Sequence, residues 1–319
     1  MSTQNATNRI PEAASRRVSA RGGLLARRPL VSFFVLTFAL TWLGWSPWFL
    51  SEAGVGLLPY DGGQFATYIN VAGLILGPTL SAFVLTGAVE GREGVLRLLR
   101  RIVLWRVGLR WYLFVVAGIP AIVLLSAAVM PGALASFEAA TVPSVLFLYV
   151  VAGLFLLFVG GPVFEEIGWR GFALPRLQPI YGPLVGSLVL GTLWGLWHLP
   201  LFLIPGWDTP HGSVLDVALF VVLAVSLAVV STWVFNNTQG SVLIASLAHG
   251  SFNMGIASAY DLFPVPAVTG GFANFVIGFG VAALVIVALT RGRLGYGQEG
   301  VELESKVKPK RRPANDGNP

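Results

Sequence analysis

The sequence predicts an all-α, polytopic membrane protein with eight transmembrane helices. Of its 319 residues, 55% are hydrophobic and only 11% are charged, whereas soluble domains average about 25% charged residues. The mean hydropathy is +0.74. This composition excludes a single water-soluble core as the main architecture, and it excludes a disordered or fibrous chain. The absence of cysteine excludes disulfides, a thiol nucleophile and Cys-based metal sites.

Eight apolar runs are each long enough to cross a bilayer, which requires about 20 mostly apolar residues. The first follows Arg27 and Arg28 and has no small-residue cleavage site after it, so we expect a retained anchor. Tryptophans near its far end are typical of an interfacial aromatic belt (Trp42, Trp45 and Trp48). The eight predicted spans lie near Leu30–Leu50, Phe65–Val89, Trp111–Met130, Ser144–Ala173, Pro183–Pro205, Ser213–Phe235, Ser241–Ala259 and Gly271–Thr290.

The basic residues predict the topology of these spans. All 21 Lys and Arg lie before residue 30, between Arg92 and Arg110, at Arg170 and Arg176, or after Thr290. The alternate connections contain acidic residues instead. Basic connections stay in the cytoplasm, so both termini are predicted to be cytoplasmic in an integral, multi-pass protein. The polar segments 1–28 and 292–319 are predicted to be disordered basic tails around a membrane domain at 29–291.

The net charge of +6 would indicate a nucleic-acid partner in a soluble chain. Here the charges follow the membrane topology, so no nucleic-acid partner is predicted. The stretch Gly94–Leu109 mixes arginines with apolar residues and predicts an amphipathic helix on the anionic inner leaflet. Anionic lipid is therefore a predicted partner of residues 92–110. The alternative is a topology signal with no further role.

Ionisable residues inside a span are costly, so each of them requires a reason. Glu165 and Glu166 are adjacent in the segment GPVFEEIGWRGFALPRL, and adjacent helical side chains point about 100° apart. The two carboxylates are therefore expected to have different roles. Glu166 can pair with Arg170 one turn later. Glu165 has no such partner and can act as a general base. Pro175 is expected to end this helix.

Two further helices supply polar groups. His198 follows Trp194 by one turn, and His249 and Asn253 share a helix face. One such residue alone more often joins helices than catalyses a reaction. Three helices that each supply polar groups favour a site. A proton-coupled transporter would use the same groups as a relay spread along the membrane normal, and a catalytically silent scaffold or immunity protein would retain them without turnover.

The three motifs resemble those of the CPBP family, the CaaX-protease and bacteriocin-processing intramembrane proteases, which include the Rce1-like and Abi proteins. The family pattern is EExxxR, then an aromatic residue four positions before His, then HxxxN. Here the motifs are Glu165–Arg170, Trp194–His198 and His249–Asn253, in that order. The motif-bearing region runs from about Ser144 to Ala259. The family usually has Phe at the position of Trp194.

This resemblance implies a conical cavity open to the cytoplasmic side and an endopeptidase that cleaves a membrane-anchored protein or peptide, including prenylated CaaX-type substrates. It implies that Glu165 activates water and that His198 holds this water and passes a proton to the leaving amine. His249 and Asn253 would stabilise the oxyanion. Glu166 and Arg170, with Trp194 nearby, would brace the helix that carries Glu165 without taking part in the reaction themselves.

Two alternatives are expected for the cofactor: a single divalent metal, or none. Glu165, His198 and His249 would suit a single divalent metal such as zinc, with one position left for water. The same residues also suit a metal-free glutamate protease, which we favour because HExxH is absent.

Ideal helix geometry sets a condition on this site. If the fifth span began at Pro183, His198 would lie about 22 Å deep, but His249 would lie about 12 Å deep. If His198 and His249 lie at the same depth in one site, the helix of the fifth span is predicted to start near Val189 or Leu190. The same condition predicts a shallow or re-entrant connection over Gln178–Ser187.

Overall fold

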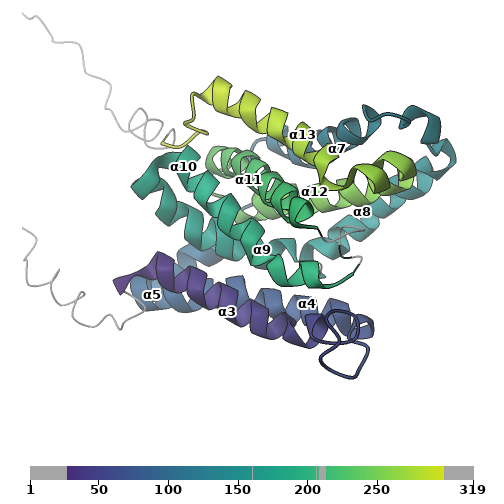
Figure 1. Cartoon of the computed structure of the whole chain (residues 1–319). Helices are drawn as coiled ribbons and strands as arrows, with labels where there is room; N and C mark the ends of the chain where they lie inside the picture. Colours follow the sequence, from purple (N-terminus) through teal and green to yellow (C-terminus); the bar gives the residue numbers. More distant parts are fainter. Residues whose placement is uncertain (1–26, 160, 206, 208–212, 298–319) are drawn as a thin grey trace, which may run out of the picture.

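The computed structural model describes residues 27–159, 161–205, 207 and 213–297. These residues form helices and no β-strand, so the predicted fold class is confirmed (Figure 1). The predicted tails 1–28 and 292–319 lie outside the described residues, apart from the few residues next to the membrane domain.

The N-terminal part of the chain agrees with the first three predicted spans. Helix α3 covers Pro29–Phe49. A second continuous stretch comprises η1 (Gly63–Phe65), α4 (Ala66–Leu74), η2 (Ile75–Thr79) and α5 (Leu80–Ile102). The third comprises α6 (Leu109–Leu113), η3 (Phe114–Gly118) and α7 (Ile119–Ala128). The amphipathic helix predicted to reach Leu109 ends at Ile102, and a break at Gly91 separates it from the apolar part of α5.

The fourth and fifth predicted spans differ from the structure. The run Ser144–Ala173 is not one helix, because α8 (Val142–Val159) is followed by a break at Gly161, which has a φ of 114°. After short turns η4 (Leu134–Ser136) and η5 (Ala139–Thr141) and helix α8, the chain continues through α9 (Pro162–Gly168), η6 (Trp169–Ala173), α10 (Leu174–Trp197) and η7 (Leu199–Leu203).

Helix α10 is a hairpin. Gly182 has φ 77° and ψ 166°, which reverses the chain between two helical legs. The expectation that Pro175 ends the helix is wrong, because the helix runs on to the reversal at Gly182. The expectation that the second leg starts near Val189 or Leu190 is also wrong, since the helix resumes at Pro183. Glu165 and His198 lie nearly the same number of residues before and after Gly182, and this symmetry brings them to similar depth.

Wide π-helical turns occur where prolines disturb the spans. The segments η2, η3 and η6 are π-helical, and each contains a proline or precedes one by a residue or two. A proline lacks the N–H that would bond the carbonyl four residues earlier. In the third span Pro120 leaves the Val116 carbonyl without its helical donor, and the Tyr149 hydroxyl of α8 donates to this carbonyl at 2.7 Å. Such substitution by neighbouring helices makes proline tolerable inside a membrane.

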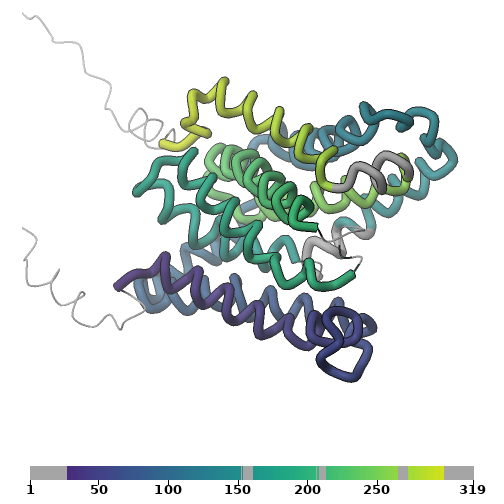
Figure 2. The backbone as a smooth tube through the Cα atoms, in the orientation of Figure 1, coloured from purple at the N-terminus to yellow at the C-terminus, as the bar shows by residue number. Residues whose placement is uncertain are grey.

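The last three spans close the bundle. They are α11 (Val214–Asn237), α12 (Val242–Leu262) and α13 (Pro264–Thr290). Helix α11 begins with a capping box in which Ser213 and Asp216 satisfy each other's backbone N–H groups. As the tube in Figure 2 shows, α11 lies along the α10 hairpin and α13 lies along α11, whereas α3 and the α4–α5 stretch form the opposite side.

Seven helical stretches among the described residues are long and apolar enough to cross a membrane, rather than eight. One of them is the 42-residue stretch Pro162–Leu203, which contains the hairpin. Helix α8 is not among the seven. Large apolar side chains on the outer faces of the bundle are exposed, such as Leu43 at 70% and Leu289 at 82%. Exposure of this kind suits a lipid-facing surface.

The glycine at the hairpin turn provides a test of this fold. Gly182→Ala is expected to lower the free energy of unfolding by about 1–3 kcal/mol, because only glycine adopts this backbone conformation without strain. An added Cβ at Gly182 would meet no atom within 4 Å, so the loss would report backbone strain alone. The measurement is thermal or denaturant unfolding in detergent.

Gly280 is the matched control, since it also has open space around it but lies inside helix α13. Gly280→Ala is expected to leave stability unchanged or to raise it by up to about 1 kcal/mol. Equal effects of the two substitutions would contradict a strained turn at Gly182.

Candidate functional site

Glu165 is placed by the break before α9. Gly161 adopts a positive φ that other residues rarely adopt, and its carbonyl accepts the Glu165 N–H at 3.0 Å. An added Cβ at Gly161 would lie 3.3 Å from the Glu165 carboxylate. Glu165 is 7% exposed, and its Oε2 accepts a hydrogen bond from the Trp194 indole Nε1 at 2.7 Å. The carboxylate therefore approaches the second leg of the hairpin.

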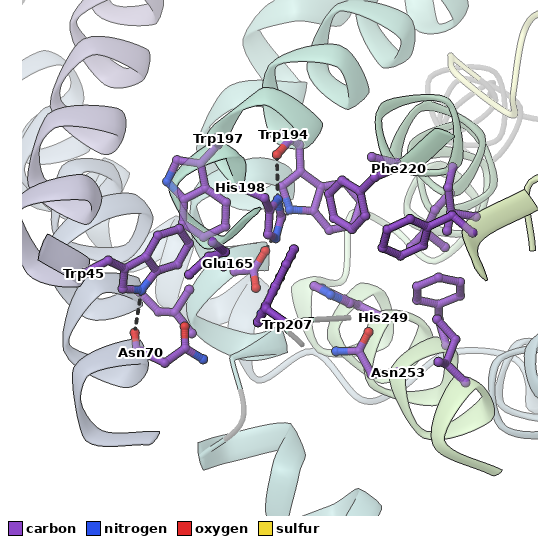
Figure 3. Close-up of a pocket in the computed structure, with 18 residues that line it drawn as sticks. Trp45, Asn70, Glu165, Trp194, Trp197, His198, Trp207, Phe220, His249 and Asn253 are labelled. Carbon is purple, nitrogen blue, oxygen red and sulfur yellow. Dashed lines mark hydrogen bonds between the residues drawn. The ribbon is translucent and has the colours of Figure 1, made fainter. Parts of the chain in front are cut away.

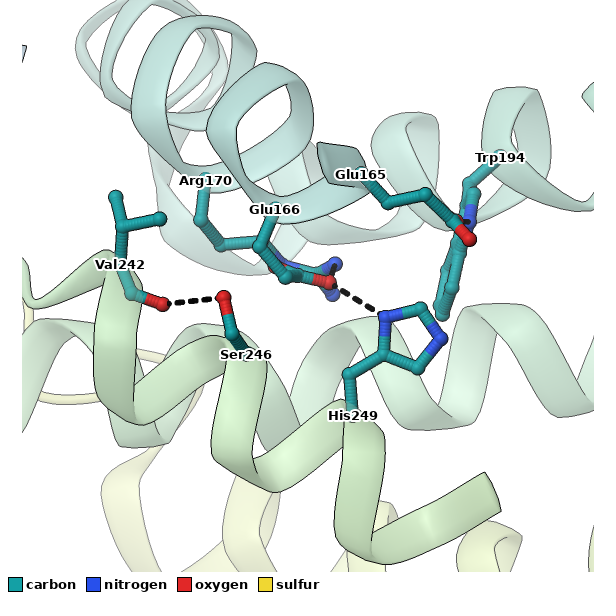
Figure 4. Close-up of polar contacts among 7 residues, drawn as sticks. All are labelled: Glu165, Glu166, Arg170, Trp194, Val242, Ser246 and His249. Carbon is teal, nitrogen blue, oxygen red and sulfur yellow. Dashed lines mark hydrogen bonds and ion pairs between the residues drawn. The ribbon is translucent and has the colours of Figure 1, made fainter. Parts of the chain in front are cut away.

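Glu166 points to the other side and forms a buried polar cluster. Arg170 Nη1 donates to Glu166 Oε1 at 2.7 Å, so the predicted i,i+4 pair is present. Both side chains are fully buried. His249 Nδ1 lies 3.2 Å from the same carboxylate oxygen (Figure 4). The Arg170 guanidinium also lies 5.1 Å from the centre of the Trp194 ring. One pair of opposite charges thus connects α9, α10 and α12.

The hydrogen bonds of the two histidines fix their ring orientations. His198 Nδ1 lies 2.9 Å from the Trp194 carbonyl, and because a carbonyl only accepts, Nδ1 is the donor. His198 Nε2 therefore lacks a proton in the neutral ring. His249 Nδ1 faces the Glu166 carboxylate, and so its Nε2 is on the side away from Glu166 (Figure 4). Each histidine is held by one ring nitrogen, and the other remains available for chemistry.

All four predicted catalytic residues line one pocket of about 270 Å³ (Figure 3). Glu165 comes from α9, His198 from the end of α10, and His249 and Asn253 from α12. Glu165, His198 and His249 are each at least nine-tenths buried, whereas Asn253 is exposed. Trp194 lies between the histidines, with its ring centre 6.1 Å from His198 and 5.1 Å from His249. The pocket therefore has room for water beside a carboxylate, two imidazoles and an amide.

The residues predicted as metal ligands do not form a compact ligand set. Among the residues that the structure describes, no three His, Asp or Glu side chains lie close enough together to hold a metal ion. Glu165, His198 and His249 share the pocket walls, but they form hydrogen bonds with the Trp194 indole, the Trp194 carbonyl and Glu166, respectively.

The aromatic lining of the pocket is not apparent from the motifs. Trp45 was expected to belong to an interfacial belt, but it is 1% exposed and packs against Trp197 at 4.6 Å between ring centres. Trp207 stacks on His198 at 5.8 Å, and Phe220 contacts it edge-on at 4.9 Å. No local pattern distinguishes these side chains from lipid-facing ones. Asn70 also lines the pocket, and its polarity inside an apolar span is the one signal that could have identified it.

Comparison with known proteins agrees with the motifs. Residues 147–255 match the family model described as type II CAAX prenyl endopeptidase Rce1-like. The chain is also similar to CAAX prenyl protease 2 of Methanococcus maripaludis, with 30% identity over 104 residues. This match covers 32% of the chain and 38% of the relative's length. Both results confirm the family resemblance predicted from the three motifs, over the segment that contains them.

The buried pair gives a test of this cluster. Arg170→Met is expected to lower the free energy of unfolding by about 3–5 kcal/mol, because it leaves the Glu166 carboxylate buried without its cation. Arg97 is the control, since its pair with Glu90 is exposed, and Arg97→Met is expected to cost less than about 1 kcal/mol. Unfolding in detergent measures both. The double variant Glu166→Gln with Arg170→Met should be more stable than Arg170→Met alone, and a double variant at least as unstable would contradict the assignment.

Proposed function

We propose that this chain is an intramembrane endopeptidase that hydrolyses a peptide bond of a membrane-associated protein or peptide. The observation that supports this most strongly is the convergence of Glu165, His198, His249 and Asn253 on one pocket. Hydrolysis requires groups within reach of one water, whereas a proton relay would spread them along the membrane normal. The family match and the CAAX-type relative support the same reaction class.

In the proposed reaction Glu165 takes a proton from a water molecule, whose oxygen attacks the carbonyl carbon of the scissile bond. The Trp194 indole N–H holds one oxygen of this carboxylate and so fixes its direction. His198 Nε2, which lacks a proton in the neutral ring, accepts a hydrogen bond from the same water. It then takes the proton from the Glu165 carboxyl group and passes it to the nitrogen of the leaving amine as the C–N bond breaks, so that Glu165 returns to the carboxylate. The second proton of the water stays on its oxygen, and the products are one carboxylic acid and one amine.

His249 and Asn253 are proposed to stabilise the oxyanion of the tetrahedral intermediate. The Asn253 amide is a donor on the exposed side of the pocket. His249 Nδ1 faces the Glu166 carboxylate, so Nε2 donates to the developing charge only in the imidazolium form, in which both ring nitrogens carry a proton. Donors that are already in place act without reorganisation at the moment of reaction, which makes such stabilisation effective. Arg170 balances the charge of Glu166 in this arrangement.

The remaining assignments concern the membrane. We propose that both termini are cytoplasmic and that anionic lipid contacts the basic segment 92–110. Arg92, Arg97 and Arg100 are exposed on one side of α5, whereas Gly94 and Leu98 are buried, which suits a helix lying along a charged surface. Prenylated CaaX-type proteins are the substrate class that the resemblance favours.

Glu165→Gln is expected to reduce peptide cleavage at least about 100-fold, since a general base contributes roughly that much or more. Glutamine still accepts the Trp194 hydrogen bond, so the fold should be retained. The assay is cleavage of a fluorogenic farnesylated peptide by the purified protein in nanodiscs. Glu138→Gln is the control, because Glu138 is an exposed carboxylate outside the pocket. Full activity of the Glu165→Gln protein would refute the proposed reaction.

Asn253→Ala is expected to lower kcat by about 100- to 1,000-fold with little change in KM, because an oxyanion donor acts mainly in the transition state. Ser258→Ala is the matched control in the same helix, since the Ser258 hydroxyl donates to the Met254 carbonyl of its own helix. Steady-state kinetics separate the two parameters. A rise in KM with kcat unchanged would instead indicate a role in substrate binding.

A further inference from the structure

The pocket lies at one end of the bundle. Seven helices in the described part of the chain contribute lining residues, and five of them contribute at least one from the part nearer the same end, while His249 and Leu227 lie near the middle of α12 and α11. The five residues nearer that end are Trp45 late in α3, Asn70 early in the α4–α5 stretch, Phe220 early in α11, Ile256 late in α12 and Phe272 early in α13. Trp207, in the connection before α11, covers the pocket from this end.

The two ends of the bundle differ in charge. The end that contains the pocket has the acidic connections, with Glu52, Asp61, Glu138 and Asp261 among the described residues. The other end has the start of α3 after Arg28, the end of α5 at Arg100 and Arg101, and the end of α13 before Arg291. Contacts between segments distant in sequence confirm that these basic ends lie together. Arg176 pairs with Glu90, and the Asn236 amide bonds both Gln178 and the Leu294 carbonyl.

The basic end is closed below the pocket. Glu166, Trp169, Arg170 and Leu174 have no exposed surface, and Leu177 is 2% exposed. Together they fill the space between the pocket and the hairpin turn at Gly182. A peptide that reaches Glu165 from the basic end would have to displace a buried ion pair, and removing the partner of a buried charge is costly. Entry from the acidic end requires no such displacement.

Basic connections remain in the cytoplasm, so the acidic end faces the opposite side of the membrane. We infer that the pocket opens on the extracytoplasmic side and admits an uncharged, apolar peptide segment at the outer leaflet. That the admitted segment is cleaved rests on the proposed function, but the orientation does not. This orientation favours peptides at the outer leaflet over the prenylated CaaX-type proteins that the resemblance suggests, because those are anchored at the cytoplasmic leaflet. The resemblance implies a cavity open to the cytoplasm. In this fold that orientation and cytoplasmic termini exclude each other, because both termini adjoin the basic end.

The lining selects the kind of segment that enters. Around the four proposed catalytic residues the wall is aromatic and aliphatic, with Trp45, Trp207, Phe220 and Phe272. Among the residues that the structure describes, this wall contains no Lys, Arg or further carboxylate. A charged side chain would lose its hydration there without gaining a partner. Apolar residues next to the scissile bond are therefore required, while the exposed Asn253 amide remains free for the peptide backbone.

The absence of cysteine from the chain makes a direct test of orientation simple. Single cysteines would be placed at Ile256 and Asn70 in the pocket, at exposed Glu138 on the acidic end and at exposed Arg97 on the basic end. Intact cells are treated with a charged, membrane-impermeant maleimide before and after permeabilisation. We expect Glu138→Cys and at least one pocket cysteine to label in intact cells, and Arg97→Cys to label only after permeabilisation.

Two results would overturn the inference. One is labelling of Arg97→Cys in intact cells with Glu138→Cys protected, which would reverse the topology. The other is pocket cysteines that label only under the conditions that label Arg97→Cys, which would place the entrance on the basic side. Two pocket positions are used so that one poorly folded variant does not decide the outcome.

A second arm separates this inference from the proposed function. Right-side-out vesicles are given an apolar fluorogenic peptide that bears a sulfonated dye and so cannot cross the membrane. Cleavage of the external peptide by wild type and not by Glu165→Gln supports both proposals. If the external cysteines are labelled but neither external nor encapsulated peptide is cleaved, the proposed orientation is supported and the proposed peptidase function is refuted. If only encapsulated peptide is cleaved, the orientation is refuted and the peptidase function is supported.

Discussion

A charge buried in an apolar bundle requires a partner, and the pair of Glu166 and Arg170 satisfies this requirement within one helical turn. The consequences extend beyond the two residues. His249 of α12 is held by the same carboxylate, and the Trp194 ring lies beside the guanidinium. Because Glu166 is fixed toward Arg170, its neighbour Glu165 must point about 100° away along the helix. That direction leads into the pocket, so an interaction without direct access to substrate determines where the reactive carboxylate lies.

The fold class and the convergence of the polar residues could be predicted from the sequence for one physical reason. A lipid environment excludes unpaired polar groups, so the few that remain inside the spans are informative. Glu165, His198, His249 and Asn253 stand out against apolar runs, and they line one pocket. The pairing of Glu166 with Arg170 follows from spacing alone, and the structure contains it.

The details of helix geometry could not be predicted in the same way. Pro175 suggests a helix end, but the preceding π-helical turn accommodates it and the helix continues. Gly161 and Gly182 break the chain through backbone conformations that are not distinguishable in sequence from the many other glycines. Those two breaks convert two predicted spans into a short helix and a hairpin. Trp45 shows a related limit, because an interfacial tryptophan and a pocket tryptophan have the same local sequence context.

The π-helical turns also bear on how such a chain tolerates insertion and deletion. A π turn holds one residue more than the α-helical turn it replaces, so the segment Trp169–Ala173 can be regarded as an α-helix with one residue inserted. Loss of a single residue there would restore an unbroken α-helix, and because the wide turn already absorbs the extra residue, the helical segments on its two sides would keep nearly their present directions. Loss of a residue from the α-helical stretch after Glu166 would instead rotate both carboxylates by about 100° relative to the hairpin. The wide turn is therefore where this part of the chain absorbs a change of length with the least effect on the direction of Glu165.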